Sequence, residues 1–146
     1  MKKTIKSFSI CLIIIAMISS TAFAAAPGEP DNSQKNSYIF KTTVGIAALG
    51  NGKIEVDFAV TATGKMPDAG AMFVDIYNES GKCVKIFWYT DPDYSYMMGH
   101  NRVSQSASVF YQGVSGQCYY AIVTFYAGDL NGSGGMASLK SALIMA

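Results

Sequence analysis

The feature that most constrains the fold of this chain is the run of residues 118–127, which reads CYYAIVTFYA. Its residues are almost all aromatic, β-branched or small, a composition typical of a strand that is buried on both faces. The segment that follows is rich in glycine as far as Gly135 and predicts a turn. Residues 136–144 can then return beside the run, so the sequence predicts a central hairpin against which the other strands pack.

The parity of this strand divides its side chains between two faces, because successive side chains of a strand point to opposite sides. We expect the core set to be Tyr119, Ala121, Val123 and Phe125. The opposite set is Tyr120, Ile122 and Tyr126. In a two-layer fold the opposite set would face solvent. Half of all residues are hydrophobic, so these apolar side chains still need a cover. The opposite set therefore predicts either an exposed aromatic patch or a surface that another chain covers, such as a second copy in a homo-oligomer.

Six further runs, each bounded by turn signals, predict the remaining strands. They cover residues 38–49, 53–63, 71–77, 83–89, 103–111 and 136–144. Residues 64–70 contain Pro67 and two glycines, so they predict a connection. Most connections are too short for the crossover helices of a parallel sheet. The expected fold is all-β, an antiparallel two-sheet sandwich of about seven strands, immunoglobulin-like in the broad sense.

The run of residues 83–89 carries one further expectation about the core. Val84, Ile86 and Trp88 share one face of this strand, whereas Lys85 lies on the other. Because a lysine normally marks the solvent side of a strand, we expect Trp88 to be buried.

The N-terminus predicts export from the cell. Three lysines precede the apolar stretch of residues 10–18, and Ala22-Phe23-Ala24 supplies a small-x-small cleavage site. Nine apolar residues are too few to span a bilayer, which needs about 20. We therefore expect a cleaved signal peptide at residues 1–24, a flexible leader at residues 25–36 and a β-sandwich domain at residues 37–146, with a secreted, extracellular product.

Charge restricts the partners of the mature protein. Without the three lysines of the signal, eight basic residues face ten acidic ones, a net charge of −2. Nucleic-acid binding needs a clustered basic face, and a membrane surface attracts polybasic segments. The sequence therefore predicts neither a nucleic-acid partner nor a membrane partner.

Residues 120–134 (YAIVTFYAGDLNGSG) resemble the strand and following turn near the end of fibronectin type III and related immunoglobulin-like modules. The chain also resembles a set of short, secreted, functionally uncharacterised proteins of Gram-positive bacteria. The matching features are Thr61-Ala62-Thr63-Gly64, a strand that ends near Trp88, and residues 116–127. The resemblance implies an immunoglobulin-like fold and secretion, and it brings no catalytic residues.

Cys83 and Cys118 are the two cysteines that remain after cleavage, and they form a candidate disulfide. In the strand order of the fibronectin type III fold, a third strand would lie between them. Two strand spacings amount to about 9.6 Å, beyond the roughly 7 Å over which Cα atoms can be bridged. A native bond would therefore contradict that topology.

Residues with catalytic or metal-binding chemistry are sparse. The only histidine is His100, and no serine has a nucleophile motif around it. The segment from Asp129 to Gly134 starts like a calcium-binding loop, but Lys140 stands where a bidentate glutamate is required. Asp91 and Asp93 form a second weak pair. We therefore expect no enzyme activity, no cofactor and no metal.

The longest loop, residues 90–102, carries an aromatic and methionine cluster. Its expected exposed members are Tyr94, Tyr96 and Met97, which could stack on a glycan or anchor a protein partner. The alternative is that they only cap the end of the sandwich.

The predicted function is a secreted, non-catalytic extracellular binding module. The alternatives are a self-associating structural or cell-surface protein and, third, a bacteriocin-like polypeptide.

Overall fold

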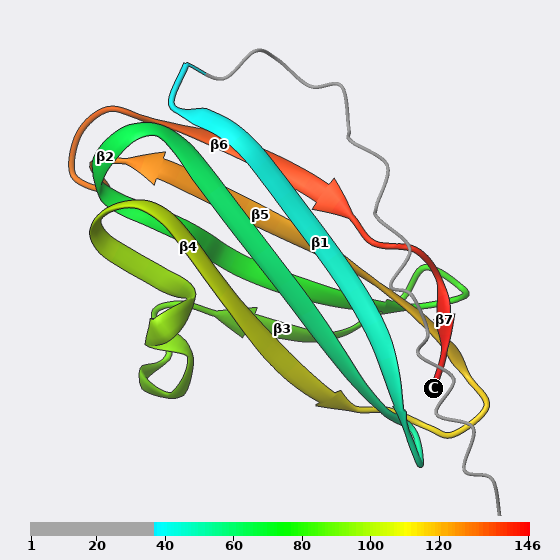
Figure 1. Ribbon diagram of the computed structural model, residues 1–146. Helices are drawn as coiled ribbons and strands as arrows, with labels where there is room; N and C mark the ends of the chain where they lie inside the picture. Colours follow the sequence, from blue (N-terminus) through cyan, green and yellow to red (C-terminus); the bar gives the residue numbers. More distant parts are fainter. Residues whose placement is uncertain (1–36) are drawn as a thin grey trace, which may run out of the picture.

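The computed structural model describes residues 37–146, and the predicted signal peptide and leader lie outside these residues. The described chain is all-β apart from one short 3-10 helix (Figure 1). Its elements are β1 (Ile39–Gly50), β2 (Lys53–Asn78), β3 (Cys83–Trp88), η1 (Pro92–Met97), β4 (Met98–Gln112), β5 (Cys118–Gly128), β6 (Gly134–Lys140) and β7 (Ile144–Met145). The seven strands form one hydrogen-bonded antiparallel sheet, which confirms the all-β class and the antiparallel pairing. The number of strands equals the predicted one because the predicted strands 53–63 and 71–77 merge into β2, whereas the predicted strand 136–144 is divided into β6 and β7.

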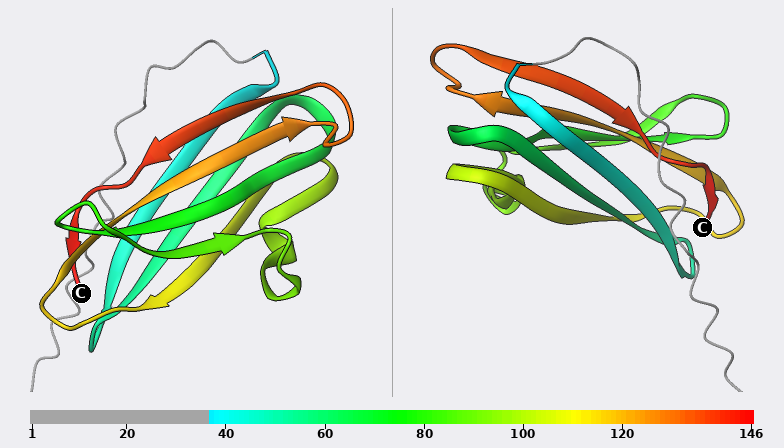
Figure 2. Two further views of the ribbon diagram at one scale, coloured as in Figure 1. Left: turned by 180° about the vertical axis from the view of Figure 1, so that it is seen from behind. Right: turned by 45° about the horizontal axis from the view of Figure 1, so that its top comes forward.

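The long strand β2 determines the shape of the sheet. Its first half pairs with β1 and its second half pairs with β3 and β5, whereas β4 pairs with the first half and continues past it as far as Gly70. Between Thr61 and Met66 the register against β4 shifts, and four residues of β2 lie opposite the single residue Val103. Such an irregularity bends a strand and increases its twist. The sheet consequently curls into a half-barrel, which Figure 2 shows from two sides.

The connection predicted at residues 64–70 is therefore wrong, because the chain continues there as strand. Pro67 and the glycines suggested a break, since proline has no N–H to donate to a ladder. In the structure Pro67 lies at the bend and immediately precedes Asp68, the first residue of β2 that pairs with β5. The register against β4 is the same on both sides of Pro67, from Met66 opposite Arg102 to Asp68 opposite His100, so the strand continues through the proline just after the shift.

Two sections of the curled sheet face each other across the core. The three-stranded section contains β1, the first half of β2 and β4, and the four-stranded section contains β3, the second half of β2, β5 and β6 (Figure 1). The predicted core set of β5 is confirmed. Its members are at most 2% exposed: Tyr119, Ala121, Val123 and Phe125.

The predicted orientation of β3 is wrong. Phe87 is 2% exposed, whereas Trp88 is 44% exposed. The reason is the register, because Phe87 lies opposite the fully buried Val74 and directly opposed residues point to the same face. Lys85 misled the interpretation. Lys85 lies on the core side, but β3 is an edge strand of the sheet. Its long side chain can therefore reach solvent, with Nζ 5.2 Å from the centroid of the Phe87 ring.

The strand β5 is buried on both faces only in its second half. From Cys118 to Ile122 buried and half-buried residues alternate, and from Val123 to Gly128 every residue is buried. Tyr126 is 8% exposed, and its hydroxyl donates a hydrogen bond to the carbonyl oxygen of Asp129 at 2.6 Å. Tyr126 therefore packs within the structure, and the outward set of β5 reduces to Tyr120 and Ile122.

Candidate functional site

The candidate site is the face of the four-stranded section that points away from the core, which we call the outer aromatic face. The left view of Figure 2 shows this section from behind. Strand registers arrange its side chains in three rows across the strands. The middle row runs Ile86, Asp75, Ile122 and Lys140. One flanking row runs Trp88, Phe73, Thr124 and Ser138, and the other contains Tyr77 and Tyr120.

Two aromatic pairs stand on this face, one on each side of the middle row. The rings of Phe73 and Trp88 lie 5.0 Å apart at 45°, and those of Tyr77 and Tyr120 are stacked at 5.2 Å and 8°. Each pair contributes about 0.5–1.5 kcal/mol beyond the area it buries. The rings therefore hold each other in place before any partner arrives, which lowers the entropy cost of binding.

Asp75 lies between the two aromatic pairs. Its Oδ1 atom is buried and has no hydrogen-bond partner within the described chain. Burial raises the pKa of this carboxyl above its ordinary value of 3.8. A buried acceptor without a partner costs about 1–3 kcal/mol, and more when it is charged. Such an atom is rare in a native protein and marks a position where a donor from outside would be favourable.

Lys140 is the positive charge of the same row. Its Nζ lies 4.0 Å from the centroid of the Tyr120 ring, a cation–π contact that orients the side chain. Within residues 37–146 it makes no ion pair, since the one ion pair found there joins Asp68 to His100. The outer aromatic face thus carries one negative and one positive group, with Ile122 between them.

The predicted loop site is only partly accessible. Met97 is fully buried, which corrects the prediction that it is exposed. Tyr94 is half-buried, and its ring packs edge-on against Phe87 at 5.0 Å. Tyr96 is 46% exposed, and its hydroxyl donates to the carbonyl oxygen of Ser108 at 3.0 Å. Tyr94 and Met97 therefore pack against the end of the fold, as the capping alternative predicts. Of the three residues, Tyr96 alone is exposed to solvent.

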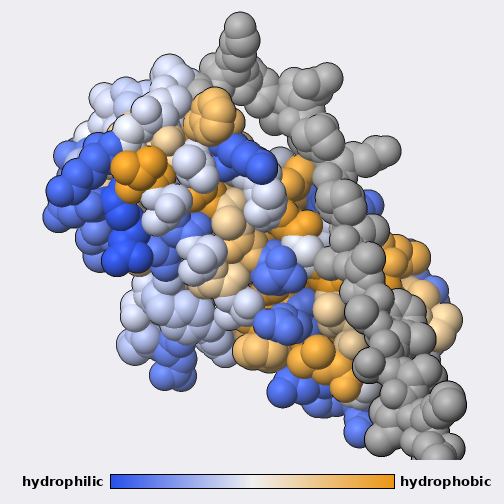
Figure 3. All heavy atoms as spheres, viewed as in Figure 1, coloured by the Kyte–Doolittle hydropathy of each residue, from blue (hydrophilic) through white to orange (hydrophobic). Residues whose placement is uncertain are grey.

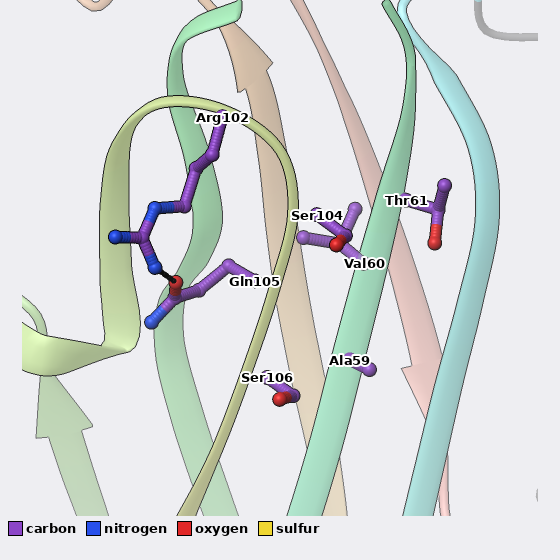
Figure 4. A pocket seen from close by; sticks show the side chains of 7 residues that line it. All are labelled: Ala59, Val60, Thr61, Arg102, Ser104, Gln105 and Ser106. Carbon is purple, nitrogen blue, oxygen red and sulfur yellow. Dashed lines mark hydrogen bonds between the residues drawn. The ribbon is translucent and has the colours of Figure 1, made fainter. Parts of the chain in front are cut away.

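A polar hollow of about 370 Å³ adjoins this loop, between β2 and β4 (Figure 4). Nη1 of Arg102 donates to Oε1 of Gln105 at 2.8 Å, and Nε2 of Gln105 donates to the carbonyl oxygen of Tyr96 at 2.6 Å. Gly99 leaves room for this arrangement, because a Cβ there would collide with the Arg102 side chain. Arg102, the only arginine of the chain, is thus held in place without a carboxylate partner in the described structure.

The hollow opens on the outer surface of the three-stranded section, whose chemistry differs from that of the outer aromatic face. Small and polar residues face each other there: Asp57 and Ser108, Ala59 and Ser106, and Thr61 and Ser104. Figure 3 views the molecule from this side and shows blue and white surface mixed with orange patches.

His100, the only histidine, serves a structural contact in this fold. Its Nδ1 lies 2.7 Å from Oδ1 of the buried Asp68, and Oδ2 of Asp68 accepts the N–H of Leu130 at 3.0 Å. These bonds tie β2 to β4 and to the loop after β5. Asp129 is likewise a turn former, since its Oδ1 accepts the N–H of Asn131 at 2.9 Å. The part of the chain that the structure describes holds no cluster of three or more potential metal ligands.

Both remaining cysteines are free thiols. Cys83 lies beside Tyr77 at the start of β3, and Cys118 lies at the start of β5. The second half of β2 runs between these strands, which is the strand order that places the two sulfurs too far apart to bond.

Sequence reasoning missed most of the outer aromatic face. Trp88 was expected in the core, and Phe73, Asp75 and Tyr77 were not singled out. A signal existed, because residues 73, 75 and 77 share one parity of their strand. An acid between two aromatics at that spacing indicates an outward face with an isolated charge.

Comparison with known proteins finds no matching family model, no matching curated protein and no matching solved structure. Over residues 37–146 we also find no helix whose length and apolarity would let it cross a membrane. Function must therefore be argued from the geometry above.

Proposed function

We propose that this chain is a secreted, non-catalytic binding module that recognises a protein partner through the outer aromatic face. The observation that carries the proposal is the pair formed by the exposed Trp88 and the half-buried Phe73, beside a carboxylate oxygen that lacks a hydrogen-bond partner. Protein interfaces are enriched in aromatic anchors, and their hot spots lie in the centre of such patches. A flat face with two preformed ring pairs suits another protein surface better than it suits a small molecule, which needs a concave site.

The order of strand pairing supports the immunoglobulin-like part of the proposal. Three strands pair as β1–β2–β4, and four pair as β3–β2–β5–β6, which is the grouping expected of fibronectin type III modules. The difference is that β2 belongs to both groups. The N-terminal pattern of residues 1–24 supports secretion.

The tryptophan emission of the protein tests this function directly, because Trp88 is the only tryptophan. We expect the emission to move to shorter wavelength when the purified protein is titrated with extracellular proteins of its source organism or with itself. Phe73→Ala removes the neighbouring ring and should raise the partner concentration needed for half of the emission shift at least tenfold. Tyr96→Ala, on the loop, is the matched control and should leave it unchanged. An emission maximum that never moves, with acrylamide quenching also constant, would contradict the proposal.

A second candidate function is glycan binding at the polar hollow. Two adjoining hollows of about 370 and 310 Å³ share Arg102 and Gln105, and the second is also lined by Tyr96 and His100. A fixed guanidinium next to hydroxyl groups and an exposed ring can bind an acidic sugar. A glycan array that includes acidic sugars tests this function. We expect Arg102→Ala to abolish binding and Trp88→Ala to preserve it, whereas an array without any hit removes the candidate.

A further inference from the structure

We propose that the outer aromatic face binds the same face of a second copy of this chain, in a two-fold symmetric dimer in which Asp75 of each copy pairs with the partner's Lys140. The inference rests on the proposed function, because it names the partner of the same face. It follows from the position of the two charges in one row of the sheet and from what each charge lacks within its own chain.

The registers place the charges symmetrically about β5. Asp75 lies opposite Ile122, and Ile122 lies opposite Lys140, so each charge is one strand away from Ile122. Adjacent strands are about 4.8 Å apart, which separates the two charged residues by about 9.6 Å. A two-fold axis that runs parallel to β5 above Ile122 therefore brings Asp75 over the partner's Lys140, and Lys140 over the partner's Asp75.

Other two-fold arrangements of the same faces are less favourable. An axis perpendicular to the strands over the same row would place the two copies of Asp75 opposite each other, and likewise the two copies of Lys140. Like charges that meet across an interface cost several kcal/mol. Charge complementarity thus selects the axis along β5.

Each charge gains what its own chain does not provide. The Asp75 carboxylate has no donor within the described chain and is half-buried, so an ammonium group that approaches its accessible side supplies the hydrogen bond it lacks. Lys140 is exposed but already oriented by the Tyr120 ring at 4.0 Å, so little side-chain entropy is lost when it pairs. On the axis Ile122 meets its own copy, which places an apolar contact between the two ion pairs.

The extent of the face sets the expected strength. Three strand spacings and the four residue steps from Phe73 to Tyr77 span a patch about 14 Å on each side between Cα atoms. Even with its side chains this patch lies below the roughly 800 Å² per partner of a standard stable interface. We therefore expect a reversible dimer with a dissociation constant in the micromolar range.

Sedimentation velocity of the purified protein between about 1 and 500 µM tests the dimer. We expect the wild type to shift from monomer to dimer over this range. Asp75→Lys and Lys140→Asp, each alone, place like charges in both contacts and should weaken dimerisation at least tenfold. An equimolar mixture of the two variants restores both contacts, so it should dimerise within about threefold of the wild type.

This complementation separates a specific dimer from general stickiness of an aromatic surface. Circular dichroism checks that each variant is folded. If Asp75→Lys does not fold, Asp75→Asn replaces it and should weaken the dimer about tenfold, while the exposed Lys140→Asp variant remains informative. Lys85→Asp, on β3, is the matched control and should dimerise as the wild type does.

Three outcomes would overturn the inference: a monomer at every concentration, single variants that dimerise like the wild type, or a mixture that stays monomeric. A strict monomer whose Trp88 emission still responds to another protein would overturn the dimer and leave the proposed function standing. A dimer that Phe73→Ala and Lys140→Asp both leave unchanged would contradict the two proposals together.

Discussion

Replacing Asp75 by asparagine should make the monomer more stable at neutral pH. The carboxylate lies between apolar and aromatic neighbours, and its Oδ1 has no hydrogen-bond partner. Burial raises its pKa above 3.8, so the folded protein binds a proton at Asp75 more readily than the unfolded chain does. The charged form is consequently a cost to folding at pH 7. Asparagine has nearly the same shape and removes the charge.

The size of the effect follows from the desolvation of one partly buried charge. A shift of one pKa unit corresponds to about 1.4 kcal/mol, and Asp75 is only half-buried, so solvent reduces the figure. We expect a gain of about 1 kcal/mol in the free energy of unfolding. For a domain of this size that gain raises the melting temperature by about 4 °C.

The dependence on pH gives the sharper test. The cost of the charged form is fully present above the raised pKa, falls as the pH drops through it, and disappears well below 3.8, where Asp75 is protonated in both states. The difference between Asp75→Asn and the wild type should therefore be largest at pH 7 and vanish near pH 3. Urea unfolding at pH 3, 5 and 7 measures it, at a protein concentration low enough to keep the chain monomeric.

Asp57→Asn is the matched control, because Asp57 is an exposed aspartate on the same strand. It should change the free energy of unfolding by less than about 0.5 kcal/mol. The reasoning about Asp75 would be refuted if Asp75→Asn destabilised the monomer at pH 7, or if its effect were the same at every pH.

Four further substitutions test the packing. Phe87→Ala should cost about 3–5 kcal/mol and Trp88→Ala only about 1 kcal/mol, because the first ring is buried and the second faces outward; equal losses in urea unfolding would contradict the observed parity of β3. Gly70→Ala should cost several kcal/mol and lower the melting temperature by more than 10 °C, because its Cβ would collide with the backbone of Met97 and Met98; a melting temperature within 2 °C of the wild type would show that the two strands separate easily. Asp68→Asn should cost about 1–2 kcal/mol and speed hydrogen exchange of the Leu130 amide, which loses a charged acceptor; unchanged exchange would show that this bond does not hold the loop.

The sequence was sufficient where a local pattern and the tertiary structure agree. The core set of β5 could be predicted, because its alternation is unbroken by any charge and its inward residues are the bulky ones. Antiparallel pairing followed from short connections and turn signals. These features depend only on period and chain length.

The sequence was insufficient where a prediction depended on a single residue. Lys85 reversed the predicted faces of β3, because an edge strand lets a lysine on the core side reach solvent. Pro67 suggested a loop inside β2, because the sequence does not reveal that the strand continues through the bend that precedes this residue. Both errors concern sheet edges and bends, which are set by the pairing of distant strands. The outer aromatic face could not be predicted for the same reason, since the error on β3 placed Trp88 in the core.

The double membership of β2 has a consequence for how the chain acquires its structure. A single strand pairs with four of the other six, and its second half needs β5, which starts 40 residues after β2 ends. During synthesis the local hairpins of β2 with β1 and with β3 can form early. The remainder must wait until most of the chain has emerged, because non-local pairing is slow and costs loop entropy before it gains contacts. We therefore expect one cooperative folding step for both sections, and a cut at the bend between Thr61 and Met66 would leave neither fragment with a complete sheet.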